Sequence, residues 1–195
     1  MSDPLFDETD DGTPLSLEER EGLIPTHITL RGELNEFEQH NIALASLWAF
    51  ARKRNVLNVT FFRNLHRRML KDVWRWAGEY RTTGKNIGVD AWRIGPDLAQ
   101  LVDDVRYWVD NDTYGVDEIA ARFHHRLVSI HPFPNGNGRF ARLAADLLLV
   151  RLGKKPFSWG SGSLVDMGHL RASYITALRE ADHNNYQALI EFVRS

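Results

Sequence analysis

The segment that decides the fold reads His131-Pro132-Phe133-Pro134-Asn135-Gly136-Asn137-Gly138-Arg139-Phe140-Ala141-Arg142. An apolar helical pattern ends at Ile130, and a new one begins around Asn137. The two glycines that flank Asn137 allow the backbone to turn sharply and to approach a ligand without obstruction by a Cβ atom. The segment therefore predicts an irregular loop that joins two helices.

The second half of this loop has the features of an anion site. The amides of Gly136, Asn137 and Gly138 are expected at the start of a helix, where unpaired N–H groups and the macrodipole favour negative charge. Arg139 and Arg142 are three positions apart, so they share a helix face and can fork onto phosphate oxygens. Together these groups predict a cradle for a polyphosphate.

His131 stands at the start of the loop, beside the predicted cradle. An imidazole near neutral pH can accept a proton from a hydroxyl group that attacks phosphorus. Phe133 is expected to point inward and to anchor the loop. The alternative is a capped loop with a structural histidine and two surface arginines. The presence of a base, a cradle and paired arginines in one short segment favours the reactive site.

The composition is that of a soluble globular protein, with 43% apolar and 26% charged residues in a chain of 195. The chain has no cysteine, which excludes disulfides, thiolate metal sites and a cysteine nucleophile. It has no apolar run long enough to span a membrane and no signal-peptide pattern, so we expect a cytoplasmic protein. Eight acidic residues fall within residues 1–22, and the remainder is too weakly basic to predict direct nucleic-acid binding.

Helical periodicity dominates the rest of the chain, which predicts an all-α fold with a small β-hairpin flap, or an extended flap, between Tyr80 and Gly95. We expect an acidic N-terminal arm at 1–26, an N-terminal helix at 27–56 and the main domain at 57–195. The helices of the main domain are expected at Thr60–Gly78, from Pro96, and at Asp117–Ile130, Arg139–Leu152, Ser163–Ala181 and Asn184–Val193.

The pattern His-Pro-Phe-x-x-Gly-Asn-Gly-Arg-x-x-Arg at 131–142 resembles the signature of the Fic family, within the Fic/Doc (Fido) superfamily. The segment Asp72 to Arg81, together with Leu65 to Met69, resembles the family's approach to its flap. Leu23 to Asn41 is similar to the subgroup called mobile mystery protein B. The resemblance covers about residues 23–195 and implies a helical Fic core.

The resemblance implies a protein adenylyltransferase that uses ATP and Mg²⁺, attaches AMP to a Tyr, Thr or Ser hydroxyl of a target protein and releases pyrophosphate. By position, His131 would be the base. The residues implied in nucleotide binding are Phe133, Asn135, Gly136, Asn137, Gly138, Arg139 and Arg142. Within this set, 136–138 would hold the α-phosphate, Arg139 the β- and γ-phosphates and Arg142 the γ-phosphate.

Asn135 departs from the family pattern, which has Asp or Glu there to hold Mg²⁺. A neutral amide oxygen is a weaker ligand for Mg²⁺ than a carboxylate. Two alternatives therefore stay open beside adenylyl transfer. One is transfer from another nucleotide or diphosphate donor on the same fold, and the other is a non-catalytic nucleotide-binding module.

Two further features follow from the resemblance. The flap would pair with the target backbone as an added strand, and its residues are Thr82, Thr83, Gly84, Lys85, Asn86, Ile87, Gly88 and Val89. Thr29 to Glu33 partly fits the family's inhibitory motif, so Glu33 would restrain Arg142; the alternative is a Glu that stabilises the first turn of its own helix. The subgroup also implies an antitoxin-like or DNA-binding regulatory partner.

Overall fold

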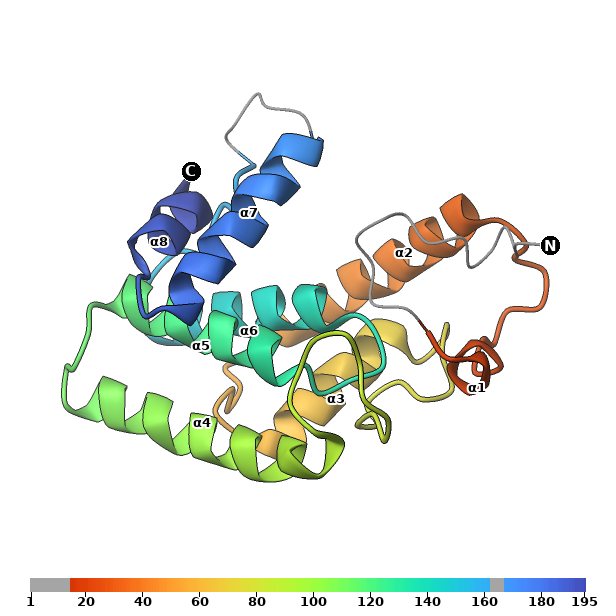
Figure 1. The fold of residues 1–195 in the computed structure, drawn as a ribbon, viewed down its shortest axis with the longest axis horizontal. Helices are drawn as coiled ribbons and strands as arrows, with labels where there is room; N and C mark the ends of the chain where they lie inside the picture. Colours follow the sequence, from red (N-terminus) through yellow and green to blue (C-terminus); the bar gives the residue numbers. More distant parts are fainter. Residues whose placement is uncertain (1–14, 162–166) are drawn as a thin grey trace.

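The computed structural model describes residues 15–161 and 167–195, which form eight α-helices and one short 3-10 helix (Figure 1). The prediction of a mainly helical fold is confirmed. In chain order the elements are α1 (Leu17–Arg20), α2 (Arg31–Phe50), α3 (Val59–Leu70), η1 (Ala91–Arg93), α4 (Ile94–Asp110), α5 (Val116–Ile130), α6 (Asn137–Arg151), α7 (Met167–Asp182) and α8 (Gln187–Arg194). Most of the predicted arm and the predicted helix start at Ser163 lie outside the described residues.

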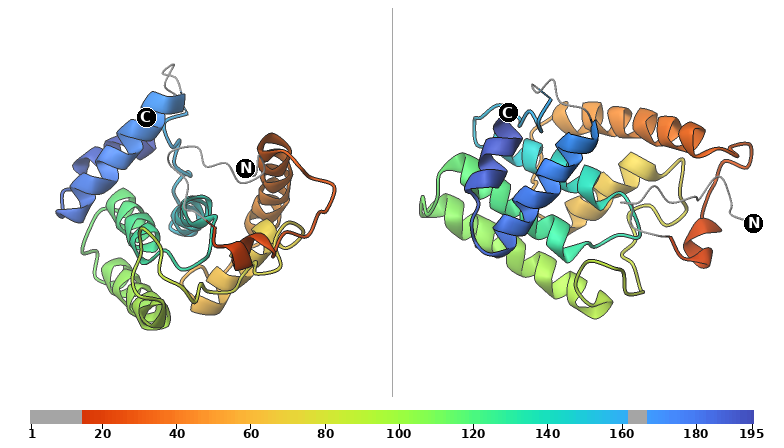
Figure 2. Two further views of the ribbon diagram at one scale, coloured as in Figure 1. Left: turned by 45° about the vertical axis from the view of Figure 1, so that its right-hand side comes forward. Right: turned by 45° about the horizontal axis from the view of Figure 1, so that its top comes forward.

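Helix α6 is the central element. It packs along α5 and also contacts α2 and α3, and the left view of Figure 2 shows it in teal, almost end-on, among these helices. An apolar surface on nearly all sides is typical of a helix buried in the middle of a fold. The fully buried residues of α6 are Phe140, Ala141, Ala144, Ala145, Leu148 and Leu149. The N-terminal end of α6, where the sequence predicts phosphate binding, is therefore held in place by the packing of this helix in the core.

Aromatic side chains connect the helices beneath the loop of residues 131–142. Phe62 of α3 packs against Phe123 of α5 and Phe140 of α6, with 5.9 Å between ring centroids in both pairs. Fully buried aromatic residues contribute large apolar areas to stability. This packing holds the end of α5 and the start of α6 in one rigid core.

A second apolar cluster lies under α7 and α8 (blue in Figure 1). Tyr174 of α7 and Leu189 and Val193 of α8 pack there against Leu149 of α6 and Phe157. This cluster places one face of α7 beside the N-terminal half of α6, where α7 contributes residues to a pocket described below.

Two predicted boundaries differ from the structure. Asn58, not Thr60, caps α3, since its Oδ1 accepts from the Phe61 amide at 3.1 Å. The helix ends at Leu70, well before Gly78, and short turns follow. The periodic spacing of Val73 and Trp76 reflects burial or partial burial of these turns, and not a continuing helix.

The described part of the predicted arm is attached to the body. Leu15 is buried, the Ile24 amide donates to the Val73 carbonyl at 2.9 Å, and Trp76 Nε1 donates to the Glu19 carbonyl at 2.9 Å. These contacts lay α1 against the turns that follow α3. In the described residues, no helix is both long and apolar enough to cross a membrane.

Candidate active site

The loop between α5 and α6 is held by its own side chains. Gly136 has a φ of +76°, and a Cβ there would lie 3.0 Å from Leu70 Cδ1, so the position requires glycine. The Asn137 side chain is buried and makes two hydrogen bonds with the main chain of Phe133. Its Oδ1 accepts from the Phe133 amide at 2.9 Å, and its Nδ2 donates to the Phe133 carbonyl at 2.7 Å. The Asn137 side chain therefore stabilises the loop. The phosphate contact predicted for this residue can come only from its main-chain N–H group.

The predicted cradle faces a pocket of about 340 Å³ at the start of α6. Its lining residues are His131, Asn135, Gly136, Asn137, Gly138, Arg139, Arg142, Arg171, Tyr174 and Ile175. A Cβ at Gly138 would meet no atom within 4 Å, so this glycine leaves open space in front of the first-turn amides. The structure thus gathers a histidine, helix-end amides and three arginines around one cavity.

His131 ends α5 in a left-handed conformation, with φ 52° and ψ 62°. The residue is only 4% exposed. Burial, followed by the positive charge of Arg81 and then that of Lys85, lowers the pKa of the imidazole to about 4, and a hydrogen bond with the Val128 main chain opposes this shift. At neutral pH the ring is therefore uncharged and can accept a proton.

Phe133, predicted in the nucleotide-binding set, is fully buried and does not line the pocket. Its ring stacks on His66 with 3.7 Å between centroids and meets Phe140 edge-on at 5.1 Å. The ring fills the core below the loop, so nothing in this geometry supports a side-chain contact with nucleotide, and the place of Phe133 in the nucleotide-binding set stays a prediction. Its predicted role as the loop's anchor agrees with this packing.

His66 supports the loop from α3. Its Nδ1 accepts from the Gly78 amide at 3.0 Å, so its Nε2 carries the hydrogen and donates to the Asn135 carbonyl at 3.0 Å. Complete burial lowers its pKa to about 3, which keeps the ring neutral. His66 thus fixes the position of the Asn135 main chain relative to the core.

The two motif arginines are held by different parts of the fold. Arg139 Nη1 donates to Glu38 Oε2 at 2.7 Å, and Glu38 Oε1 accepts from Trp74 Nε1 at 2.7 Å. The Arg142 guanidinium carbon lies 4.8 Å from the Tyr174 ring centroid and 5.6 Å from that of Trp159. Both arginines are oriented before any ligand binds.

Glu33 does not approach Arg142 through any contact that the structure shows. Its Oε2 accepts from the amides of Thr29 and Leu30 at 3.2 and 3.3 Å, which is the helix-stabilising alternative for this residue. The carboxylate that reaches a motif arginine is that of Glu38. Sequence reasoning missed it, although the buried register Leu34, Glu38, Asn41 of α2 places an acid in an otherwise core-facing stripe.

The flap, residues 82–89, is an irregular loop with bends at 83 and 86–88 and not the predicted hairpin, since no residue from 79 to 90 is in a strand. The carbonyls of Thr83 and Val89, which a hairpin would use between strands, accept from the Arg81 guanidinium. Near the middle of the flap, Lys85 forms a buried ion pair with Glu19 of α1. Ile87 is half exposed.

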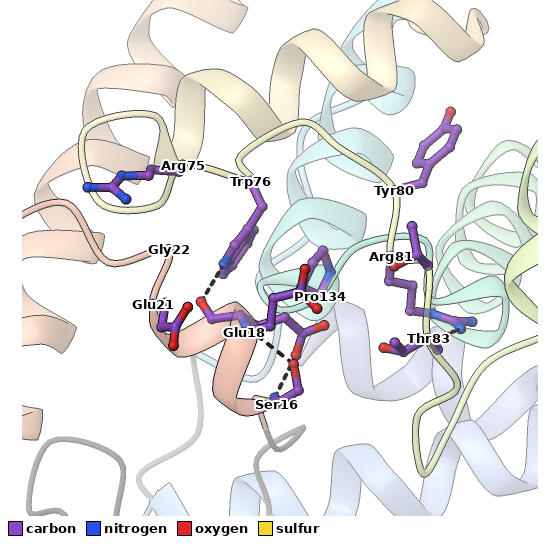
Figure 3. Close-up of a pocket in the computed structure, with 12 residues that line it drawn as sticks. Ser16, Glu18, Glu21, Gly22, Arg75, Trp76, Tyr80, Arg81, Thr83 and Pro134 are labelled. Atoms are coloured by element: carbon purple, nitrogen blue, oxygen red, sulfur yellow. Dashed lines mark hydrogen bonds between the residues drawn. The ribbon is translucent and has the colours of Figure 1, made fainter.

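A second pocket, of about 470 Å³, lies between α1 and the base of the flap. In Figure 3, Ser16, Glu18 and Glu21 lie on one side, and Arg81 and Thr83 lie on the other. Trp76, Tyr80 and Pro134 complete much of its lining. Pro134 belongs to the loop of residues 131–142, so this pocket adjoins the flap and that loop together.

The side chains around the first pocket do not by themselves form a magnesium site. Its described lining contains no Asp or Glu, and the Asn135 Oδ1 accepts from the Gly136 amide at 2.5 Å. No group of three or more His, Asp or Glu suited to a metal occurs within residues 15–161 and 167–195. A Mg²⁺ ion would depend on phosphate oxygens for its charged ligands.

Comparisons with known proteins agree with this site. Residues 56–149, which contain the whole loop and most of α6, match the sequence model of the Fic/DOC family. The chain is 29% identical to protein adenylyltransferase fic-1 of Caenorhabditis briggsae and 27% identical to protein adenylyltransferase Fic of Drosophila grimshawi, in both cases over 94% of its length. It spans only 37% and 38% of those relatives.

Solved structures share the fold. The BepC protein of Bartonella tribocorum with bound AMPPNP has a TM-score of 0.70 at 17% identity, over 92% of this chain and 97% of that one. A Fic-1 fragment from C. elegans has a TM-score of 0.66 at 24% identity, over 89% and 51% of the two chains. The histidine, the glycine-rich helix start and both arginines, which line one pocket, all lie within the segment 56–149 that matches the Fic/DOC family model.

Proposed function

We propose that this protein transfers AMP from ATP to a hydroxyl side chain of a target protein and releases pyrophosphate. One observation carries the proposal: His131 and the phosphate cradle at the start of α6 line the same pocket. A neutral imidazole and an array of anion-binding groups at one cavity are what in-line transfer of a nucleotidyl group requires. The adenylyltransferase relatives support the choice of AMP as the transferred group.

In the proposed reaction the target oxygen forms a bond to the α-phosphorus, and the bond from that phosphorus to the oxygen bridging the β-phosphate breaks. The hydroxyl proton passes to the imidazole of His131, and pyrophosphate leaves with the bonding electron pair. Because the pKa of His131 is lowered to about 4, the ring is in its proton-accepting form at neutral pH.

The pocket supplies binding groups for the nucleotide's phosphates. Asn137 and Gly138 line the pocket at the start of α6, and their main-chain amides would hold the α-phosphate. Arg139 and Arg142 would bind the outer phosphates, and Arg171 of α7 brings a further positive charge to the same cavity. Sequence reasoning missed Arg171 because nothing in the local pattern of α7 indicates its distance from the loop.

The target would dock along the flap. The flap, residues 82–89, passes beside His131 at Gly88, and a target segment would add to it as a strand. Residues of the target that flank the modified hydroxyl would occupy the pocket between α1 and the flap (Figure 3). The acidic residues Glu18 and Glu21 and the aromatic ring of Trp76 line that pocket.

The described conformation also supports a restrained state of the enzyme. Arg139 would contact phosphate, yet its guanidinium is bonded to the buried carboxylate of Glu38. An anionic phosphate and this carboxylate would compete for the same cation. We assign the restraint to Glu38 in place of Glu33.

The experiment that tests the function uses ATP labelled at either the α- or the γ-phosphate, with wild type, His131→Ala and Glu38→Gln proteins and a cell lysate as the target source. Adenylyl transfer predicts protein-bound label from α-labelled ATP alone, increased by Glu38→Gln and absent from His131→Ala. Label from the γ position would indicate phosphoryl transfer instead. GTP and UTP in parallel test another donor, and nucleotide binding without any incorporation would establish the non-catalytic alternative that Asn135 keeps open.

A further inference from the structure

The main chain of His131 is in a conformation that its own residue type disfavours. A left-handed backbone is strained at a residue other than glycine, so the surroundings must hold it. The His131 amide continues the α5 pattern by donating to the Leu127 carbonyl at 3.1 Å. That bond fixes the nitrogen side of the residue and leaves its carbonyl to be held by another group.

The group that holds this carbonyl is the guanidinium of Arg81, whose residue is only 3% exposed. Nε donates to the His131 carbonyl at 2.7 Å, and Nη2 donates to the Ile130 carbonyl at 3.3 Å. The last carbonyls of a helix lack partners within the helix and carry the negative end of its dipole. A buried cation with several donors is well suited to that position.

The same guanidinium also holds both ends of the flap. Nη1 donates to the Thr83 carbonyl at 2.9 Å, and Nη2 donates to the Val89 carbonyl. The Arg81 main chain adds a bond from its amide to the Pro132 carbonyl at 3.0 Å. Figure 3 shows Arg81 at the base of the flap with its bond to Thr83. One side chain thus joins the flap to the loop that carries His131.

Gly88 shows how close this junction is. Its φ is +108°, and a Cβ at this position would lie 2.6 Å from Arg81 Nη2 and 2.8 Å from His131 Cβ. The flap backbone therefore passes in direct contact with both residues. Any change in the Arg81 bonds would move the flap and the imidazole relative to each other.

We propose that Arg81 is a positioning residue, which fixes the His131 imidazole against the flap so that a docked hydroxyl meets the base in reactive geometry. The proposal rests on the transfer function proposed above, but its structural part concerns His131 and the flap alone. Arg81 does not line the nucleotide pocket, although it lines the pocket between α1 and the flap, so its effect on the base passes through its bond to the His131 carbonyl.

Charge adds a measurable signature. Arg81 and Lys85 face the imidazole from the flap side, Arg139 and Arg142 line the same pocket from α6, and Arg171 and Tyr174 line it from α7. After burial itself, the charge of Arg81 does most to lower the pKa of His131. Removal of the Arg81 charge should therefore raise that pKa.

The test compares Arg81→Met and Arg81→Lys with Arg63→Met, a matched change of an arginine that bonds the Gly78 carbonyl before the flap but not the His131 loop. Titration of histidine ring signals by NMR needs no substrate. We expect the His131 titration to move up by about one pH unit in Arg81→Met and not in Arg63→Met. Amide exchange at 82–89 should become faster in both Arg81 variants, because a lysine cannot bridge four carbonyls.

In the transfer assay, Arg81→Met should lower kcat by about a hundredfold at unchanged nucleotide affinity, which is the scale expected from misplacing a reacting group by about 1 Å. An unchanged His131 titration together with wild-type flap exchange would overturn the proposal. Should Arg81→Met fail to fold, the exchange data and kcat of Arg81→Lys decide. If wild type shows no transfer, the proposed function fails, while the NMR and exchange results still decide the role of Arg81.

Discussion

Arg139 Nη1 donates to Glu38 Oε2 at 2.7 Å and so joins residues that are 101 positions apart in the sequence. The second Glu38 oxygen accepts from Trp74 Nε1 at the same distance, and the carboxylate is almost completely buried. Arg139, a cation of the predicted phosphate cradle, is therefore paired with the buried carboxylate of Glu38.

Glu38→Gln should increase nucleotide affinity. The amide keeps an acceptor for Trp74 but has no charge, so phosphate would meet a weaker competitor for Arg139. We expect a Kd for ATP about tenfold lower, measured by calorimetry, because charge-assisted hydrogen bonds contribute about 1.5–3 kcal/mol. Glu33→Gln is the matched control, and its Kd should equal that of wild type. Equal affinities in all three proteins would count against a restraint by Glu38.

The two loop glycines should respond differently to alanine. Gly136→Ala places a Cβ at positive φ and 3.0 Å from Leu70, so it should reduce the free energy of unfolding by about 1–2 kcal/mol. Gly138→Ala enters open space and should leave thermal stability unchanged. It should nevertheless weaken ATP binding, because the new methyl group occupies the space in front of the helix amides. Unaltered ATP affinity in Gly138→Ala would place the phosphates elsewhere.

Asn135→Asp should make ATP binding more dependent on Mg²⁺. The change adds a carboxylate to a pocket whose described lining has none, and Oδ1 can still accept from the Gly136 amide. A titration of ATP affinity against Mg²⁺ concentration should shift to lower Mg²⁺ in the variant. If the two titrations coincide, position 135 does not contribute a metal ligand.

Stability should fall as the pH drops below about 6.5. Burial lowers the pKa of His66 and His124 to about 3 and that of His131 to about 4, so the unfolded chain takes up these protons first. Asp146 acts in the opposite direction, because burial raises its pKa to about 6 and the folded chain binds that proton more tightly.

The net difference near pH 5 is about two protons, which corresponds to a loss of about 2–3 kcal/mol of unfolding free energy per pH unit. Denaturant unfolding at a series of pH values measures this slope. His124→Gln should reduce the difference in bound protons by about one, and the slope in proportion. His40→Gln, at an exposed position, should leave the slope unchanged. A flat profile between pH 6.5 and 5 would contradict the buried neutral histidines.

The ion pair between Glu19 and Lys85 should hold the flap to α1. Both side chains are largely buried, so loss of one partner leaves an uncompensated charge. Lys85→Met should raise amide exchange in the flap about tenfold, and Glu19→Gln combined with Lys85→Met should recover part of the protection. Identical exchange in the single and double variants would show that the pair does not couple the two segments.

Local patterns in the sequence were sufficient to predict most of the longer helices and the loop that joins α5 to α6. The turn depends on Gly136 and the cradle on groups within six positions of it, so short-range sequence carries this information. The capping box of Ser16 and Glu19 was also readable, yet α1 was missed within a segment interpreted as an arm.

Long-range contacts account for what the sequence did not predict. Arg81 bonds the His131 carbonyl across 50 positions, and these bonds replace the hairpin that the β-forming composition of the flap indicated. Arg171 of α7 and Glu38 of α2 also reach the site. Helical periodicity predicts which face of a helix a residue lies on, but not which other element packs against that face. For Glu38, the available signal in the sequence was an acidic residue among the buried positions of α2.

The position of Arg142 between Tyr174 and Trp159 has a consequence for the size of the working unit. Both rings come from beyond residue 149, where the family match ends. A fragment trimmed to that match would keep the histidine and the glycines but lose the aromatic walls that orient the second arginine. A fragment meant to keep Arg142 in this orientation should therefore extend through α7, beyond the residues that match the family model.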